Sequence, residues 1–211
     1  MKLALINGSP KPKDSASGLL CGALAQLLSG VEVCSLSLRK PSLDPQTISL
    51  LDSCDALVFV FPLYVDGIPG HLLSCLAALE QHRAKTGRSG GAVYGVVNCG
   101  FYEARQNTLA LEMLRHFCMH TGYDWKQGVG IGGGGMLSSV AGTPMGQRVK
   151  KDIGAALETF CRNILAKKGG ELLYASPNFP RFAYKMAAQR RWRAQLKQNG
   201  RSSRDLFHRE V

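Results

Sequence analysis

Short apolar segments alternate five times with helical patterns over about the first 165 residues, and this alternation constrains the fold more than any other feature. The apolar segments are residues 3–6, 31–36, 56–61, 92–97 and 125–131. The third segment is apolar throughout and ends at Pro62, as is typical of a strand buried on both faces. Because parallel strands need helical crossovers, the sequence predicts a doubly wound α/β fold with a five-stranded parallel sheet.

The segments between these strands have helical spacing of their apolar residues. The predicted helices are residues 18–28, 46–52, 69–83, 103–120 and 144–168. The second strand alternates apolar and polar residues, which predicts a position at or near an edge of the sheet. Four consecutive glycines at 132–135 predict a loop or a close approach of two backbones.

The composition favours a cytoplasmic protein without a disulfide or metal framework. No run of about 18 apolar residues occurs, and the N-terminus leads directly into a strand without signal-peptide features. The number of cysteines is odd and no Cys-x-x-Cys occurs, which argues against disulfides, zinc and an iron–sulfur cluster. The seven cysteines are at positions 21, 34, 54, 75, 99, 118 and 161.

The positive charge is concentrated in the last part of the chain. Of the formal net charge of +11, residues 180–211 carry +7 and the remainder +4. Four large apolar residues recur there at approximately helical spacing, namely Phe182, Met186, Trp192 and Leu196. We therefore divide the chain into a domain at 1–170 and a basic, partly helical extension at 171–211.

Two interpretations of this extension are open. Its arginines and aromatic residues could contact anionic lipid or nucleic acid. The favoured alternative is that its apolar side docks on the body or on a second subunit, because no polybasic block of the length needed for electrostatic anchoring is present. We accordingly expect neither nucleic-acid binding nor stable membrane insertion.

The loop after the first strand, residues 7–17, has the composition of a phosphate site. It combines three hydroxyl groups and two lysines just before a predicted helix: Ser9, Ser15, Ser17, Lys11 and Lys13. A helix N-terminus offers unpaired N–H groups and a positive dipole end. Neither the dinucleotide glycine pattern nor an ATP-type P-loop is present, so a mononucleotide bound by its monophosphate is favoured. The alternative is an ordinary turn with a helix cap at Ser15 or Ser17.

The loop after the third strand carries apolar and aromatic side chains where loops normally face water. It begins Pro62, Leu63, Tyr64, Val65. These side chains could form the wall for a flat, largely apolar ring, although Leu63 and Tyr64 could equally pack against a neighbouring helix.

The loop after the fourth strand offers a similar surface. Phe101 and Tyr102 are flat, Gly100 permits close backbone approach, and Asn98 provides a donor and an acceptor for a ring edge. These aromatic residues could instead belong to the core. We interpret Cys99 as structural, because no Lys, Arg or His lies near it in the sequence to lower the pKa of its thiol.

The three loops together resemble those of the flavodoxin-like NAD(P)H-dependent FMN reductase family, which includes quinone reductases. The resemblance rests on Asn7-Gly8-Ser9-Pro10-Lys11 with Ser15 and Ser17, on Phe61-Pro62-Leu63-Tyr64 with Pro69, and on Asn98-Cys99-Gly100-Phe101. It covers residues 1 to about 168 and implies a sheet in the order 2-1-3-4-5. It also implies a homodimer in which the partner helps to close the flavin pocket.

For this chain the resemblance implies bound FMN. The phosphate would lie on Ser9, Lys11, Ser15 and Ser17, and the ribityl chain and ring along residues 62–65 and 98–102. The flavin would take hydride from NADH or NADPH and reduce a quinone, a free flavin, or a nitro or azo compound. No catalytic side chain is expected, because the flavin N5 carries the chemistry. The alternative is a flavodoxin-like electron carrier or redox sensor, which the net charge of +11 disfavours.

Overall fold

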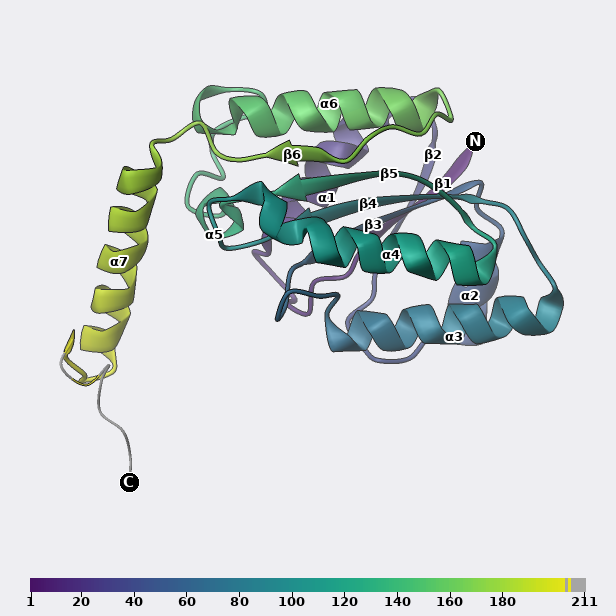
Figure 1. Ribbon diagram of the computed structural model, residues 1–211, viewed down its shortest axis with the longest axis horizontal. Coiled ribbons are helices and arrows are strands. Elements are labelled where there is room, and N and C mark those ends of the chain that lie inside the picture. Colours follow the sequence, from purple (N-terminus) through teal and green to yellow (C-terminus); the bar gives the residue numbers. More distant parts are fainter. Residues whose placement is uncertain (204, 206–211) are drawn as a thin grey trace. The chain divides into compact units, whose positions relative to one another are not determined.

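Six parallel strands form one sheet in the order β2-β1-β3-β4-β5-β6 in the computed structural model, which describes residues 1–203 and 205 (Figure 1). The strands are β1 Lys2–Asn7, β2 Glu32–Ser37, β3 Ala56–Pro62, β4 Ala92–Asn98, β5 Asp124–Ile131 and β6 Leu173–Ala175. Every pairing between neighbouring strands is parallel. The predicted doubly wound sheet and the order of its first five strands are confirmed.

Helices cover both faces of the sheet (Figure 1). They are α1 Ala16–Leu27, α2 Pro45–Asp52, α3 Gly70–Thr86, η1 Ala104–Asn107, α4 Thr108–Thr121, α5 Gly134–Leu137, η2 Arg148–Lys150, α6 Lys151–Leu165 and α7 Arg181–Gln198. One face packs against α1 and α6 and the other against α3 and α4. None of the helices in the described part of the chain is long and apolar enough to cross a membrane.

The burial of the strands follows from their place in the sheet. All but the last residue of β3 is buried, because β3 lies centrally with helices on both faces. No residue of β2 is fully buried, and β2 is at the edge, as its alternating sequence predicts. Since all strands are parallel, their carboxyl ends lie along one edge of the sheet. The loops after β1, β3 and β4 all leave the sheet at this edge.

The sixth strand was missed by the sequence analysis. Only three residues pair with β5, in the register Val129 to Leu173 and Ile131 to Ala175, and so short a segment has no detectable alternation. β6 lies in the region that the sequence analysis assigned to the extension. The compact unit that contains the sheet therefore runs from Met1 to Pro177.

Two predicted helices begin later than expected. The helix predicted from residue 144 starts at Lys151, because Gly146 and Arg148 have φ values of 79° and 47°, which interrupt a right-handed helix. The helix predicted from residue 103 begins as the 3₁₀ turn η1 and continues as α4.

The second unit, Asn178–Val211, contains α7. The helical spacing predicted for the basic extension is confirmed over Arg181–Gln198, and Gly200 follows the helix with φ of 67°. No residue of α7 is buried, and Phe182, Met186 and Trp192 are each at least 60% exposed. The end of the extension, residues 204 and 206–211, lies outside the described residues.

Candidate functional site

The loop between β1 and α1 buries its three serines. Ser9, Ser15 and Ser17 are at most 7% exposed, whereas Lys11 and Lys13 are exposed. Ser15 caps the helix, and its Oγ accepts a hydrogen bond of 3.0 Å from the N–H of Gly18. The alternative prediction of a helix cap is therefore correct for Ser15, whose hydroxyl oxygen is the acceptor in the cap.

This cap leaves other donors of the first turn unpaired. Within residues 1–203 and 205, no acceptor contacts the backbone N–H groups of Ser15, Ala16 and Ser17. Three N–H groups at the positive end of a helix dipole, beside Lys11 and Lys13, match the donor set that a phosphate dianion requires. The residues of this loop fit the phosphate of FMN.

Asn98 at the end of β4 ties the loops together. Its Nδ2 donates to Ser17 Oγ at 2.8 Å and to the carbonyl oxygen of Phe61 at 3.0 Å. The backbone carbonyl oxygen of Asn98 accepts a hydrogen bond of 2.8 Å from the N–H of Leu63. The side chain is only 3% exposed. Its side-chain amide nitrogen thus joins the loop after β1 to the end of β3, and the three loops meet at one edge of the sheet.

The loop after β3 forms a tight two-residue turn. Tyr64 and Gly67 exchange both backbone hydrogen bonds, at 3.1 and 3.0 Å. The central residues Val65 and Asp66 have φ values of 48° and 56°, and a β-branched residue rarely adopts this conformation. Val65 is fully exposed. Backbone strain of this kind, of about 1–3 kcal/mol, persists where the surrounding structure over-determines it and is common at binding sites.

The four residues of this loop that the sequence analysis selected differ in burial. Leu63 is partly buried and packs on the core, so the core alternative holds for it. Pro62 is partly buried at the end of β3. Tyr64 is 45% exposed and, with Val65, leaves apolar surface beside the edge where the loops meet.

The loop after β4 presents Gly100 and Phe101 to solvent, and Phe101 is 56% exposed. Tyr102 is partly buried, and its hydroxyl donates to the carbonyl oxygen of Pro177 at 3.4 Å. Phe101 is therefore the aromatic ring of this loop that is available to a ligand, and Tyr102 fixes the loop to the segment after β6.

The glycine run at 132–135 supports this loop from behind. The N–H of Gly133 donates to the carbonyl oxygen of Phe101 at 2.6 Å, and that of Gly134 to the carbonyl oxygen of Cys99 at 2.7 Å. The predicted close approach of two backbones is confirmed. The sequence signal was present in the four glycines, but the segment they would meet could not be identified from it.

The Cys99 thiol is buried beside the site. It is 3% exposed, and burial raises its pKa above the ordinary range of a cysteine. Asn107 Nδ2 donates to its sulfur at 3.4 Å. A thiol that is protonated and enclosed in this way is a poor nucleophile, which supports a structural role.

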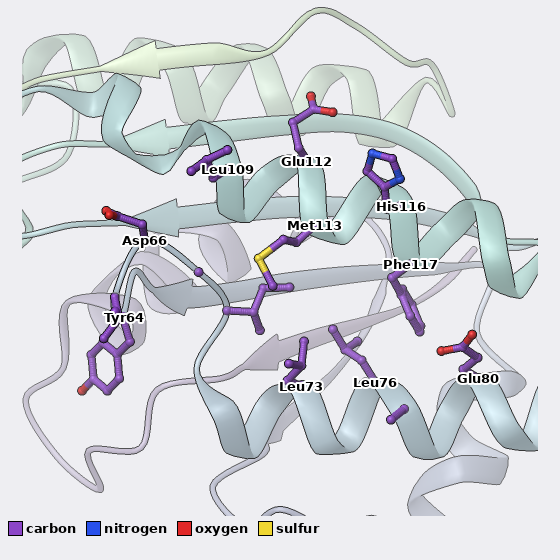
Figure 2. A pocket seen from close by; sticks show the side chains of 14 residues that line it. Tyr64, Asp66, Leu73, Leu76, Glu80, Leu109, Glu112, Met113, His116 and Phe117 are labelled. Atoms are coloured by element: carbon purple, nitrogen blue, oxygen red, sulfur yellow. The ribbon is translucent and has the colours of Figure 1, made fainter.

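An apolar groove of about 880 Å³ lies between α3, α4 and the Tyr64–Gly67 turn (Figure 2). Figure 2 shows Leu73 and Leu76 rising from α3 toward Met113 of α4, with Tyr64 at one end. Its apolar lining includes Leu73, Leu76, Leu109, Met113 and Phe117, and its carboxylates are Asp66, Glu80 and Glu112. The groove could not be predicted from the sequence, because α3 and α4 lie side by side only in the folded chain.

Comparison with known proteins identifies the family. The sequence profile of the NADPH-dependent FMN reductase family matches residues 1–123, more than half of the chain. No curated protein sequence matches the chain.

Solved structures share the fold. An NADH:FMN oxidoreductase (EMOB, apo form) superposes with a TM-score of 0.60 at 20% identity, over 81% of this chain and 91% of that chain. A flavodoxin, WrbA-like protein from Agrobacterium tumefaciens gives 0.56 at 15% identity, over 79% and 99%. An NADPH-quinone reductase from P. pentosaceus gives 0.56 at 17% identity, over 78% and 97%. The chain therefore belongs to the NADPH-dependent FMN reductase family, whose members are oxidoreductases that use FMN with NAD(P)H as reductant.

Proposed function

We propose that this protein binds FMN along the edge formed by the loops after β1, β3 and β4, and transfers electrons from NAD(P)H to a small-molecule acceptor. Quinones, free flavins, nitro compounds and azo compounds are the acceptor classes that suit this chemistry. The observation that carries the proposal is the pair of hydrogen bonds from Asn98 to Ser17 and to Phe61, which hold the three loops in one place. FMN, when bound, supplies the hydride chemistry.

The protein's part begins with the phosphate. The N–H groups of residues 15–17 would donate to its oxygens, with Ser9 and Ser17 as further hydroxyl donors. Lys11, which is exposed, would balance the charge without needing to be buried. We propose that Asn98 acts by holding the Ser17 hydroxyl in place, in addition to any contact with the ring.

The ring would lie against the two apolar loops. Tyr64 and Val65 supply one wall, and Phe101 supplies another, with Gly100 allowing close backbone approach. The strained turn keeps Val65 and Tyr64 projecting from the edge before a ligand arrives. Pro62 and Tyr102 would complete the ring site through their positions at the bases of the two loops.

We expect the purified protein to be yellow, or to become so with added FMN, and to lose the flavin absorbance band when NADPH is added without oxygen. Riboflavin, which lacks the phosphate, should bind at least about tenfold more weakly than FMN, a difference of about 1.4 kcal/mol. Steady-state turnover with a quinone would exclude a simple electron carrier. A protein that takes up no FMN, or that binds riboflavin equally well, would contradict the proposed site.

We further propose a homodimer in which the second copy covers the groove between α3 and α4. Leu73, Leu109 and Met113 are 43%, 62% and 37% exposed there, and the groove continues onto the Tyr64–Gly67 turn. A partner seated in the groove would therefore also close one side of the flavin site.

A charge introduced into the groove should disrupt this dimer. We expect Met113→Lys to run as a monomer in sedimentation experiments, because an unpaired ammonium group would be buried at the interface. Met119→Lys changes a 67% exposed residue of the same helix that does not line the groove, and should remain a dimer. A Met113→Lys protein that stays dimeric would place the interface elsewhere.

The compartment is also a proposal. All seven cysteines are free thiols. Burial raises the pKa of six of these thiols above the ordinary range of a cysteine: Cys21, Cys54, Cys75, Cys99, Cys118 and Cys161. Free thiols suit a reducing compartment, so we propose that the protein is cytoplasmic.

A further inference from the structure

Four cations gather on two neighbouring loops at the edge where FMN would bind. Lys11 and Lys13 lie in the loop after β1, and Arg39 and Lys40 follow β2. The guanidinium of Arg39 donates to the carbonyl oxygen of Pro12 at 3.3 Å, which holds the second loop against the first. In the described part of the chain, no carboxylate forms an ion pair with any of the four.

The segment that carries Arg39 and Lys40 is fixed to the body. The N–H of Leu38 donates to the carbonyl oxygen of Asn7 at 2.9 Å, which extends the pairing of β2 with β1. The thiol of Cys75 on α3 donates to the carbonyl oxygen of Lys40 at 3.2 Å. The backbone is therefore held from two sides, while the charged ends of Arg39 and Lys40 are exposed.

Arg39 and Lys40 follow β2, on the side of the loop after β1 that is away from β3 and β4, where the ring of FMN would lie. The sheet order places β2 beside β1 and opposite to β3 and β4. Neighbouring strands are about 4.8 Å apart, so the end of β2 lies roughly 10–15 Å from the ends of β3 and β4. The N–H groups of residues 15–17 with Lys11 already suit one phosphate, which leaves Arg39 and Lys40 for another anion.

We propose that Arg39, assisted by Lys40, binds the 2′-phosphate of NADPH and so selects NADPH over NADH. This inference rests on the proposed function, because a nicotinamide stacked on the flavin places the adenosine end of the dinucleotide at a distance from the ring. Selection of NADH would call for a carboxylate to accept from the ribose hydroxyls, whereas a phosphate calls for an arginine. The segment after β2 reads Ser37-Leu38-Arg39-Lys40 and contains no acid.

Of Arg39 and Lys40, we expect Arg39 to recognise the phosphate more specifically. A guanidinium can donate two parallel hydrogen bonds to one phosphate, whereas the ammonium of lysine acts as a point charge. Arg39→Lys should therefore keep only part of the selectivity, and Arg39→Ala should lose most of it.

The direct test compares the binding of adenosine 2′,5′-bisphosphate and 5′-AMP by calorimetry, which needs no turnover. We expect wild-type protein to bind the bisphosphate at least about tenfold more tightly, equivalent to about 1.4 kcal/mol. Arg39→Ala/Lys40→Ala should bind both with similar affinity. Equal affinities in the wild type, or a preference that survives in the double variant, would overturn the proposal.

Activity provides a second readout with an internal control. In the FMN-loaded enzyme, Arg39→Ala should lower kcat/KM for NADPH about tenfold and leave that for NADH within about twofold. Lys85→Ala removes an equal charge from the last turn of α3 and should change neither. Equal losses with both nucleotides would contradict the inference, whereas failure of the protein to take up FMN while it still prefers the bisphosphate would contradict only the proposed function.

Discussion

Replacing Arg83 with methionine is expected to lower the free energy of unfolding by about 3–5 kcal/mol. The side chain is 2% exposed and donates to Asp52 Oδ1 at 3.0 Å, to the carbonyl oxygen of Thr121 at 2.8 Å and to that of Gly90 at 2.8 Å. Its guanidinium carbon also lies 3.7 Å from the centre of the Tyr123 ring. Methionine would keep the volume but leave two carbonyl oxygens without this donor. The buried carboxylate of Asp52 would keep only its contacts with Arg88 and His82. Urea denaturation measures the loss, which corresponds to a fall in Tm of about 10 °C.

Arg88→Met is the matched control, because Arg88 contacts the same carboxylate at 3.2 Å from a side chain that is 54% exposed. Because the Arg88 side chain is largely in solvent, we expect its contact to contribute about 0–1 kcal/mol. Adding Asp52→Leu to Arg83→Met should restore part of the stability, because it removes the buried carboxylate that Arg83 no longer neutralises. If Arg83→Met were no more destabilising than Arg88→Met, the buried network would not have the structural importance assigned to it.

The second large effect is expected from Gly132→Ala. A Cβ at Gly132 would collide with the carbonyl oxygen of Tyr102 and would lie 3.0 Å from the N–H nitrogen of Ala104. Both neighbours are backbone atoms, so the loop after β4 must move as a whole. We expect a loss of stability of about 3 kcal/mol. The Kd for FMN should rise at least about tenfold, because Phe101 moves with the loop.

Gly135→Ala is the control for this change. A Cβ at Gly135 meets no atom within 4 Å, and the residue lies in the same glycine run. Its stability and FMN affinity should stay close to those of the wild type. A Gly132→Ala protein that binds FMN normally would show that the position of the loop after β4 does not matter for the cofactor.

The architecture could be predicted from the sequence because its signals are local. The apolar run at 56–61 is typical of a central strand of a parallel sheet, and Ser15 is a typical N-cap that marks the start of α1. The order of the loops along the chain then placed them on one edge. A central strand of a parallel sheet is buried on both faces and is therefore apolar throughout. Its position in the sheet can be predicted from this continuous apolar run.

The remaining features depend on contacts between distant segments. β6 is three residues long and can be recognised as a strand only by its pairing with β5. The bond from Asn98 to Ser17 spans 81 residues, and the contact of Arg39 with Pro12 spans 27. Nothing in the sequence near Arg39 indicated that it contacts the loop after β1. The individual ligand roles of the twelve predicted site residues stay predictions, since local sequence shows where loops lie and not what their side chains touch.

The most direct test of the account is a crystal structure of the protein with FMN. We expect the phosphate to lie on the N–H groups of residues 15–17, and the ring between Tyr64 and Phe101 at the edge that Asn98 holds together. An FMN bound elsewhere, for example with its ring in the groove between α3 and α4 and its phosphate away from residues 9–17, would contradict it.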